Sequence, residues 1–434
     1  MSFNRAQLII FGSIGAIVLL ALMLLTGVLP GLENPITRSF TIEVWGFRDP
    51  PGVWQEIANA FREEAERGAT INYSQKDPQT YESELLDALA SGKGPDVFLL
   101  QDSWIEKHAA KVKPLSDGEL GYARKNLKTI FADGIAGAIA DETGALLGTP
   151  LAFDSLALFY NRDYFNSANI PSPPRTWEEL VEDAKTLTKF SEVGGIRRSG
   201  AALGTASNVA HAPDILMALV FQSGGEIIGK DQGGSPAAAL RSPKTASALT
   251  FYAAFSDTTK RTYSWNAFFE DSIEAFAKGE TAMAVGYARD VKKIADLNPQ
   301  LNFDVAPLPQ TGGELQVNFG RFDLLAVSRT SQESENAWRF LLWLQRKETE
   351  KQYIDLVGLP PARRDLVQSK PPRDWLQPFY DQVLSARPFP IAGDDSLPNI
   401  LNDMIEAVAT KRFTVDQAMN RAAAELNRVL KPRP

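Results

Sequence analysis

Apolar and polar residues alternate at the start of the chain in a way that predicts strands and helices in turn. Residues 39–45 alternate apolar with polar side chains, as a strand with one buried face does. Residues 52–66 carry apolar side chains at helical spacing. A short strand at 69–75 and a second helix follow, and then a fully apolar run at 97–100. This order predicts a parallel sheet with helices on both faces.

The pattern continues along the rest of the chain. Further strands are predicted at 156–160, 281–286, 303–306 and 322–327. Further helices are predicted at 176–190, 210–222, 242–255, 266–278, 332–345, 348–357, 374–385, 397–410 and 415–430. A chain of 434 residues is too long for one ordinary core, so we expect two or more domains.

A separate apolar stretch precedes these elements. Residues 8–29 carry no charge over 22 positions, and a helix of that length reaches about 33 Å, enough for a bilayer core of about 30 Å. No small-residue cleavage pattern follows, and the chain has no cysteine to carry a lipid. We expect an uncleaved single-pass anchor rather than a cleaved signal peptide. Arg5 favours a cytoplasmic N-terminus, with the bulk of the chain on the extracytoplasmic side of the cell membrane.

Composition narrows the class of partner and of chemistry. The net charge of −8 argues against nucleic acid, because binding phosphates requires a basic surface. The sequence has no G-x-S-x-G, H-E-x-x-H or phosphate-loop motif. With two histidines and no cysteine, we expect no enzyme, metal site or cofactor, and we interpret His108 and His211 as surface or packing residues.

The apolar run at 97–100 changes abruptly into polar residues, Gln101, Asp102, Ser103 and Trp104. Ligands of open α/β sheets lie outside the carboxyl ends of the strands, so these residues predict a binding edge. The alternative is that Asp102 or Ser103 caps the next helix, and both can hold together.

Four segments, in this order, resemble one family. They are "ALASGKGPDVF", "GTPLAFDSLALFYNRDYFNSANIPSPPRTWEELVEDAKTLT", "FFEDSIEAFAKGETAMAVG" and "AWRFLLWLQRKETEKQYIDLVGLPPARRD". Together they resemble the extracellular solute-binding proteins of ABC importers, in the carbohydrate-binding branch that includes maltose-binding protein (family 1). The resemblance covers about residues 40 to 430.

The resemblance implies an α/β, two-lobed periplasmic-binding-protein type II fold with a ligand cleft between the lobes, here preceded by the N-terminal transmembrane helix. The implied domains are an anchor at 1–38, a first lobe of 39–153 plus 306–345, and a second lobe of 154–305 plus 346–434.

A sugar site needs aromatic plates for the C–H faces of the ring and planar polar groups for its hydroxyls. From the first lobe and the crossing segments, the candidates are Trp45, Phe47, Asp49, Gln101, Asp102, Ser103, Trp104, Asp154 and Arg321. From the second lobe, they are Asn208, Asp214, Trp265, Tyr287 and Arg289. The resemblance matches Asp102 and Asp154 to ligand-contacting positions of the family.

The family further implies a monomer that captures a small solute, with a carbohydrate expected, by hinge closure and delivers it to ABC permease subunits. Many relatives carry a tryptophan where this chain has Tyr287 and Arg289, and Pro398 and Asn399 replace further aromatics. These departures argue against maltodextrin and allow a smaller, more polar or acidic ligand. A non-sugar solute, a receptor that presents ligand to a sensor, and an extracellular enzyme are the alternatives.

Overall fold

The computed structural model describes residues 39–312, 316–388 and 396–430, together with residues 13–15, 17, 18 and 23. No helix within those residues is long and apolar enough to cross a membrane. Most of the span predicted at 8–29 lies outside the described residues, so the anchor stays a prediction.

The first lobe is built on a six-stranded sheet. Its strands are β1 (Phe40–Gly46), β2 (Ala69–Gln75), β3 (Val97–Gln101), β4 (Thr149–Ser155), β12 (Asn318–Val327) and β13 (Ala386–Pro388). β3, β1 and β2 are parallel neighbours, and β12 lies antiparallel to β3. The parallel sheet predicted from the alternating pattern is therefore confirmed for the first three strands.

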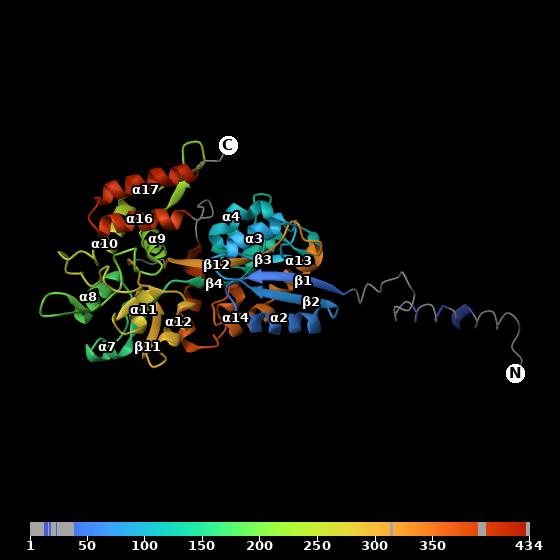
Figure 1. Cartoon of the computed structure of the whole chain (residues 1–434), viewed down its shortest axis with the longest axis horizontal. Coiled ribbons are helices and arrows are strands. Elements are labelled where there is room, and N and C mark those ends of the chain that lie inside the picture. Colours follow the sequence, from blue (N-terminus) through green and yellow to red (C-terminus); the bar gives the residue numbers. More distant parts are fainter. Residues whose placement is uncertain are drawn as a thin grey trace, which may run out of the picture.

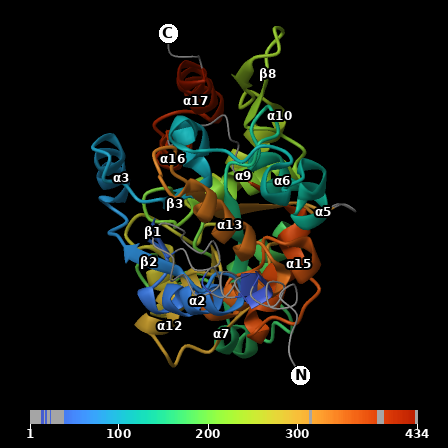
Figure 2. The ribbon, with the colours of Figure 1, turned by 90° about the vertical axis from the view of Figure 1, so that its right-hand side faces the viewer.

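Helices cover both faces of this sheet. The helices of this lobe are α2 (Pro51–Glu64), α3 (Tyr81–Ala90), α4 (Ile105–His108), α5 (Leu127–Ile130), α6 (Asp133–Ala138), α13 (Ser334–Leu344) and α14 (Lys347–Val357). α15 (Gln377–Gln382) packs between the lobes, against β4 and against the second-lobe strand at Phe303–Pro307. α2 buries Trp54, Ile57 and Phe61, which lie on one helical stripe. Figures 1 and 2 both place α2 and α3 on opposite sides of β1 and β2.

The second lobe is built on a three-stranded antiparallel sheet in the order β10 (Met283–Gly286), β5 (Ala157–Asn161) and β11 (Phe303–Pro307). Its helices are α7 (Arg162–Ser167), α8 (Trp177–Leu187), α9 (Ala212–Gln222), α10 (Pro243–Ala253), α11 (Ser272–Ala277), α12 (Asp290–Leu297), α16 (Leu397–Ala409) and α17 (Val415–Val429). Two short hairpins complete it, β6 (Lys189–Phe190) with β7 (Ile196–Arg198), and β8 (Ile228–Lys230) with β9 (Pro236–Ala238). Capping boxes at Thr176 and Thr414 fix the starts of α8 and α17.

Strands β4 and β12 cross between the lobes at the centre of the molecule (Figure 1). Along β12, Phe319 packs in the core of the second lobe and Phe322 in that of the first. Gly320 is required at the crossing, because a Cβ there would lie 2.6 Å from the ring of Phe153.

The sequence pattern indicates a chain break at Gly148–Pro150, but the structure has β4 there. An edge strand tolerates Pro150, since it needs fewer ladder donors.

The packing of the C-terminal region bears on the predicted lobe boundaries. α16 and α17 pack against α9 and α10 of the second lobe. α14 and β13, which fall in the range 346–434 assigned to the second lobe, contact α2, β4 and β12 of the first. The boundaries themselves stay a prediction.

Candidate ligand-binding site

Polar strand ends from both lobes meet at one place. Residues 47–49 follow β1 and residues 102–104 follow β3, at the same edge of the sheet because these strands are parallel. β12 runs the other way and pairs Asp323 with Gln101, so Asp323 and Arg321 lie at that edge too. From the second lobe, residues 287–290 follow β10. This convergence defines the candidate site.

Arg321 bridges the two lobes. Its Nη1 donates to Asp102 Oδ1 of the first lobe at 2.9 Å. Its Nε and Nη2 donate to the two carboxylate oxygens of Asp214 on α9 at 3.1 and 2.9 Å. Tyr287 also donates its hydroxyl to Asp214 Oδ2, at 2.7 Å. The bidentate geometry is the strong form of an arginine–carboxylate pair.

A second network surrounds Arg289. Its Nε lies 3.3 Å from Asp154 Oδ2 and its Nη1 lies 3.4 Å from Asp323 Oδ2. Asp154 is fully buried and also accepts from the backbone N–H groups of Ala288 and Arg289. Arg48 donates to the same Asp323 oxygen at 3.1 Å. Asp323 therefore serves two arginines.

His211 belongs to the site although sequence reasoning set it aside. Its Nε2 lies 2.9 Å from Asp290 Oδ2, which also accepts from the Tyr287 N–H. The rings of His211 and Tyr287 meet edge to face at 4.7 Å. Gly286 makes room for this arrangement, because a Cβ there would lie 2.8 Å from Asp290 Oδ2.

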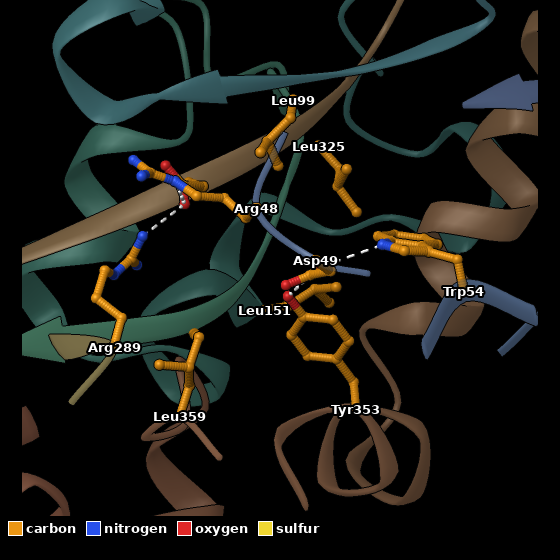
Figure 3. Close-up of a pocket in the computed structure, with 11 residues that line it drawn as sticks. Arg48, Asp49, Trp54, Leu99, Leu151, Arg289, Leu325, Tyr353 and Leu359 are labelled. Carbon is orange, nitrogen blue, oxygen red and sulfur yellow. Dashed lines mark hydrogen bonds and ion pairs between the residues drawn. The ribbon is translucent and has the colours of Figure 1, made fainter. Parts of the chain in front are cut away.

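A small cavity lies beside Asp49 and Arg289 (Figure 3). Trp54 Nε1 and the Tyr353 hydroxyl donate to Asp49 Oδ2 at 3.2 and 2.9 Å. The cavity volume is about 30 Å³, which is room for about two water molecules. Ligand pockets usually measure about 300–1,000 Å³, so this cavity, which Asp102, Asp214 and Arg321 do not line, is too small to hold a solute by itself.

The pKa values of the site aspartates are shifted in different directions. Burial raises the pKa of Asp102 above its usual range, and the opposing Arg321 guanidinium does not cancel the rise. Burial likewise raises the pKa of Asp154 against the effect of Arg289. Burial also acts to raise the pKa of Asp323, but Arg48 and Arg289 outweigh it and the pKa lies below its usual value. Asp323 is thus held as a carboxylate, while Asp102 has fewer stabilising partners than its burial requires.

Aromatic side chains border the first-lobe edge. The ring centroids of Phe47 and Tyr81 lie 4.7 Å apart, and Trp104 stacks on Tyr81 with a centroid separation of 6.3 Å. Trp104 is half-buried, so part of its ring is open to contact. Trp45 is half-buried as well, with the Lys76 ammonium 3.7 Å from its ring centroid.

The structure does not bring Asn208 and Trp265 into this arrangement. Trp265 is fully buried, stacks on Phe269 and donates its Nε1 to Asn208 Oδ1. The Asn208 amide in turn donates to the backbone carbonyls of Asn266 and Phe269. The two side chains tie second-lobe loops together, and we leave them out of the proposed site.

The capping alternative for the strand end at 101–104 finds no support. A 3₁₀ turn at Asp102–Trp104 follows β3, and neither it nor α4 has a side-chain cap. Asp102 Oδ1 accepts from the neighbouring Ser103 N–H, and both residues are buried. Asp102 Oδ2 is buried and has no hydrogen-bond partner. The carboxylate is therefore oriented by Arg321 and keeps one unused acceptor.

Sequence reasoning missed several members of the site, namely Arg48, Trp54, His211, Asp290, Asp323 and Tyr353. Asp323 had a usable signal, because it lies two positions after Arg321 and shares its face of the strand. Tyr353 had none, since it reaches Asp49 from a helix 304 positions away.

Despite the many carboxylates, no group of three or more His, Cys, Asp or Glu side chains in the described part of the chain could hold a metal ion.

Comparisons with known proteins agree on one family. The family model described as "Bacterial extracellular solute-binding protein" matches residues 56–377. A putative binding protein of Brucella abortus is 22% identical over 390 residues, covering 87% of this chain and 90% of that protein. A diacetylchitobiose-binding protein of Streptomyces coelicolor is 25% identical over 307 residues, covering 69% of this chain and 68% of that protein.

A solved structure has the same fold. The cyclic α-maltosyl-1,6-maltose-binding protein of Arthrobacter globiformis superposes with a TM-score of 0.75 at 19% identity, covering 91% of this chain and 100% of that one. With the family model matching well over half of its length, the chain belongs to the bacterial extracellular solute-binding protein family.

Proposed function

We propose that this protein acts as a monomer that captures a small hydroxylated solute, a carbohydrate, between its lobes and delivers it unchanged to an ABC permease. The observation that carries the proposal is the Arg321 bridge. Through it, Asp102 of the first lobe and Asp214 of the second converge on one buried point between the lobes. Ligands of two-lobed proteins are held where both lobes contribute such groups.

Capture requires the lobes to separate first. Arg321 ties Asp102 to Asp214 across the lobes, and the neighbouring cavity of about 30 Å³ is too small for a sugar ring, so we expect a solute to enter when the lobes move apart. The two crossing strands, β4 and β12, are the elements about which such a rotation occurs. Closure around the solute then excludes water and strengthens its polar contacts.

Two features support a carbohydrate. Carboxylates and arginines at the strand ends match hydroxyl groups, and the half-buried Trp104, which packs beside the buried Phe47, offers aromatic surface next to them. Two similar proteins have names that point the same way, one from Streptomyces coelicolor for diacetylchitobiose and one from Arthrobacter globiformis for cyclic α-maltosyl-1,6-maltose, whereas others from Yersinia enterocolitica and Shigella dysenteriae are named for sn-glycerol 3-phosphate.

A thermal-shift screen of sugars, polyols, sugar acids and amino acids tests this function. A solute present at 100 times its Kd is expected to add about 2.7 kcal/mol to the free energy of unfolding. The bound solute should be recovered chemically unchanged after incubation. A chemically altered solute would indicate an enzyme, and a screen in which sugars and polyols have no effect would count against the carbohydrate proposal.

We also propose that residues 8–29 stay on the mature protein as its membrane anchor, because the stretch is uncharged and lacks a cleavage pattern. The anchor would keep the lobes near the permease and raise their effective concentration there. N-terminal sequencing of the protein from its native membrane is expected to begin upstream of residue 8. A sequence that begins near residue 30 would contradict tethering.

A further inference from the structure

We infer that the site selects solutes that offer hydrogen-bond donors and carry no negative charge, and that Asp323 is the residue that excludes anionic solutes. The inference rests on the proposed function and specifies the class of solute. It opposes the interpretation of Arg289 and Arg321 as groups that attract an acidic ligand.

Each arginine of the site already has a carboxylate partner. Arg321 is bonded to Asp102 and Asp214. Arg289 is bonded to Asp154, and it shares Asp323 with Arg48. An incoming carboxylate or phosphate would have to replace one of these built-in anions.

Carboxyl groups outnumber cations around the site. Six aspartates face three arginines and His211; they are Asp49, Asp102, Asp154, Asp214, Asp290 and Asp323. An incoming anion would therefore find each arginine of the site already paired with a carboxylate and would meet further acidic groups beside them, where little water screens the repulsion. The site disfavours an anionic solute on electrostatic grounds.

Asp102 supplies a second, independent observation. Its side chain is 4% exposed, and its Oδ2 has no hydrogen-bond partner. A buried carboxylate oxygen without a partner is costly, and a hydroxyl or ammonium group relieves that cost, whereas a deprotonated acid group does not. The unused acceptor points to a donor-bearing solute.

Asp323 has a particular place in this balance because it neutralises two arginines at once. Its side chain is 15% exposed, and Arg48 and Arg289 approach it from the first and second lobes (Figure 3 shows the two arginines). Without the Asp323 carboxylate, the two guanidinium groups would form a site suited to an external carboxylate or phosphate.

Calorimetry with matched solutes tests the inference on the full-length protein in detergent. The probes are D-glucose, D-glucosamine and D-glucuronate, the corresponding galactose series, and glycerol with glycerol 3-phosphate. The neutral or amino member is expected to bind at least about tenfold more tightly than its acidic counterpart. An acidic member that binds as tightly or more tightly would overturn the inference and leave the proposed function standing. If no member of any series bound, both would be contradicted.

The variant Asp323→Asn identifies the residue responsible. For each series we compare the Kd of the acidic solute with the Kd of its neutral counterpart. The variant is expected to lower the ratio of the first to the second by about tenfold or more, because Arg48 and Arg289 lose their shared counter-charge. Asp257→Asn, which removes a carboxylate paired with Lys411 on the second lobe, should leave the ratio unchanged. An unchanged ratio in folded Asp323→Asn would refute its role. Should that variant fail to fold, Arg48→Gln is expected to raise the ratio, and a constant ratio there would count equally against the inference.

Discussion

Replacing Arg321 with alanine is expected to lower the free energy of unfolding by about 3 kcal/mol or more, because it leaves two buried carboxylates without their cation. Asp102 and Asp214 are 4% and 6% exposed, and Arg321 donates three hydrogen bonds to them. Urea unfolding followed by tryptophan fluorescence measures this change. In solution X-ray scattering, the solute-free variant should also have a larger radius of gyration, since the bridge between the lobes is gone.

Arg48→Ala is the matched control for Arg321→Ala. Arg48 also belongs to an arginine–aspartate pair, with Asp323, but its side chain is 36% exposed and otherwise lies over the ring of Phe47. Exposed pairs of this kind contribute about 1 kcal/mol or less. Equal losses for the two variants would contradict the role of Arg321 as the main interlobe bridge.

Replacing Asp102 with alanine is expected to raise the Kd of the bound solute about 10- to 150-fold. The reason is that a charged hydrogen bond in a dry site contributes about 1.5–3 kcal/mol. Asp102 has both features that this argument needs, burial and an acceptor oxygen without a partner. The substitution should also destabilise the fold, because Arg321 loses one of its two carboxylates.

Asp102→Asn separates these two effects. It keeps the shape and one acceptor oxygen but removes the charge that pairs with Arg321, so its Kd should lie between those of the wild type and Asp102→Ala. Asp133→Ala provides the control for aspartate loss in general, since Asp133 is 78% exposed and pairs with Arg364 on the surface. Calorimetry that gives the same Kd for Asp102→Ala as for the wild type would remove Asp102 from the site.

The fold could be predicted where side-chain periodicity reports burial directly. The alternation at 39–45 and the apolar run at 97–100 correspond to β1 and β3, since a half-buried and a fully buried strand leave those patterns. β4 was missed because Pro150 normally ends a strand, and only its edge position, a tertiary property, makes it acceptable. The helix predicted at 266–278 is shorter in the structure, where α11 begins at Ser272 directly after Asp271, whose side chain caps it.

The structure brings together the predicted residues that lie at strand ends, and it adds residues placed by tertiary contacts that the sequence pattern did not indicate. Asp102 directly follows β3, and Arg289 lies in the turn after β10. Because ligands of α/β sheets lie outside the carboxyl ends of the strands, these positions could be predicted. Trp265 could not be assigned from its residue type, because a tryptophan in a loop can stack on a ligand or pack in the core equally well. The charge that a solute meets depends on which carboxylates pair with Arg321. These partners, Asp214 and Asp102, are separated from Arg321 by 107 and 219 positions in the sequence, so the sequence pattern does not indicate them.

The position of a bound solute in a crystal structure of the complex tests the central claim most directly. The account predicts that the solute identified by the screen lies between the lobes, with a hydroxyl or amino group within hydrogen-bond distance of Asp102 Oδ2 and further contacts to Asp214 or Arg321. A solute bound elsewhere on the molecule, or one that contacts a single lobe and neither Asp102 nor Asp214, would contradict it.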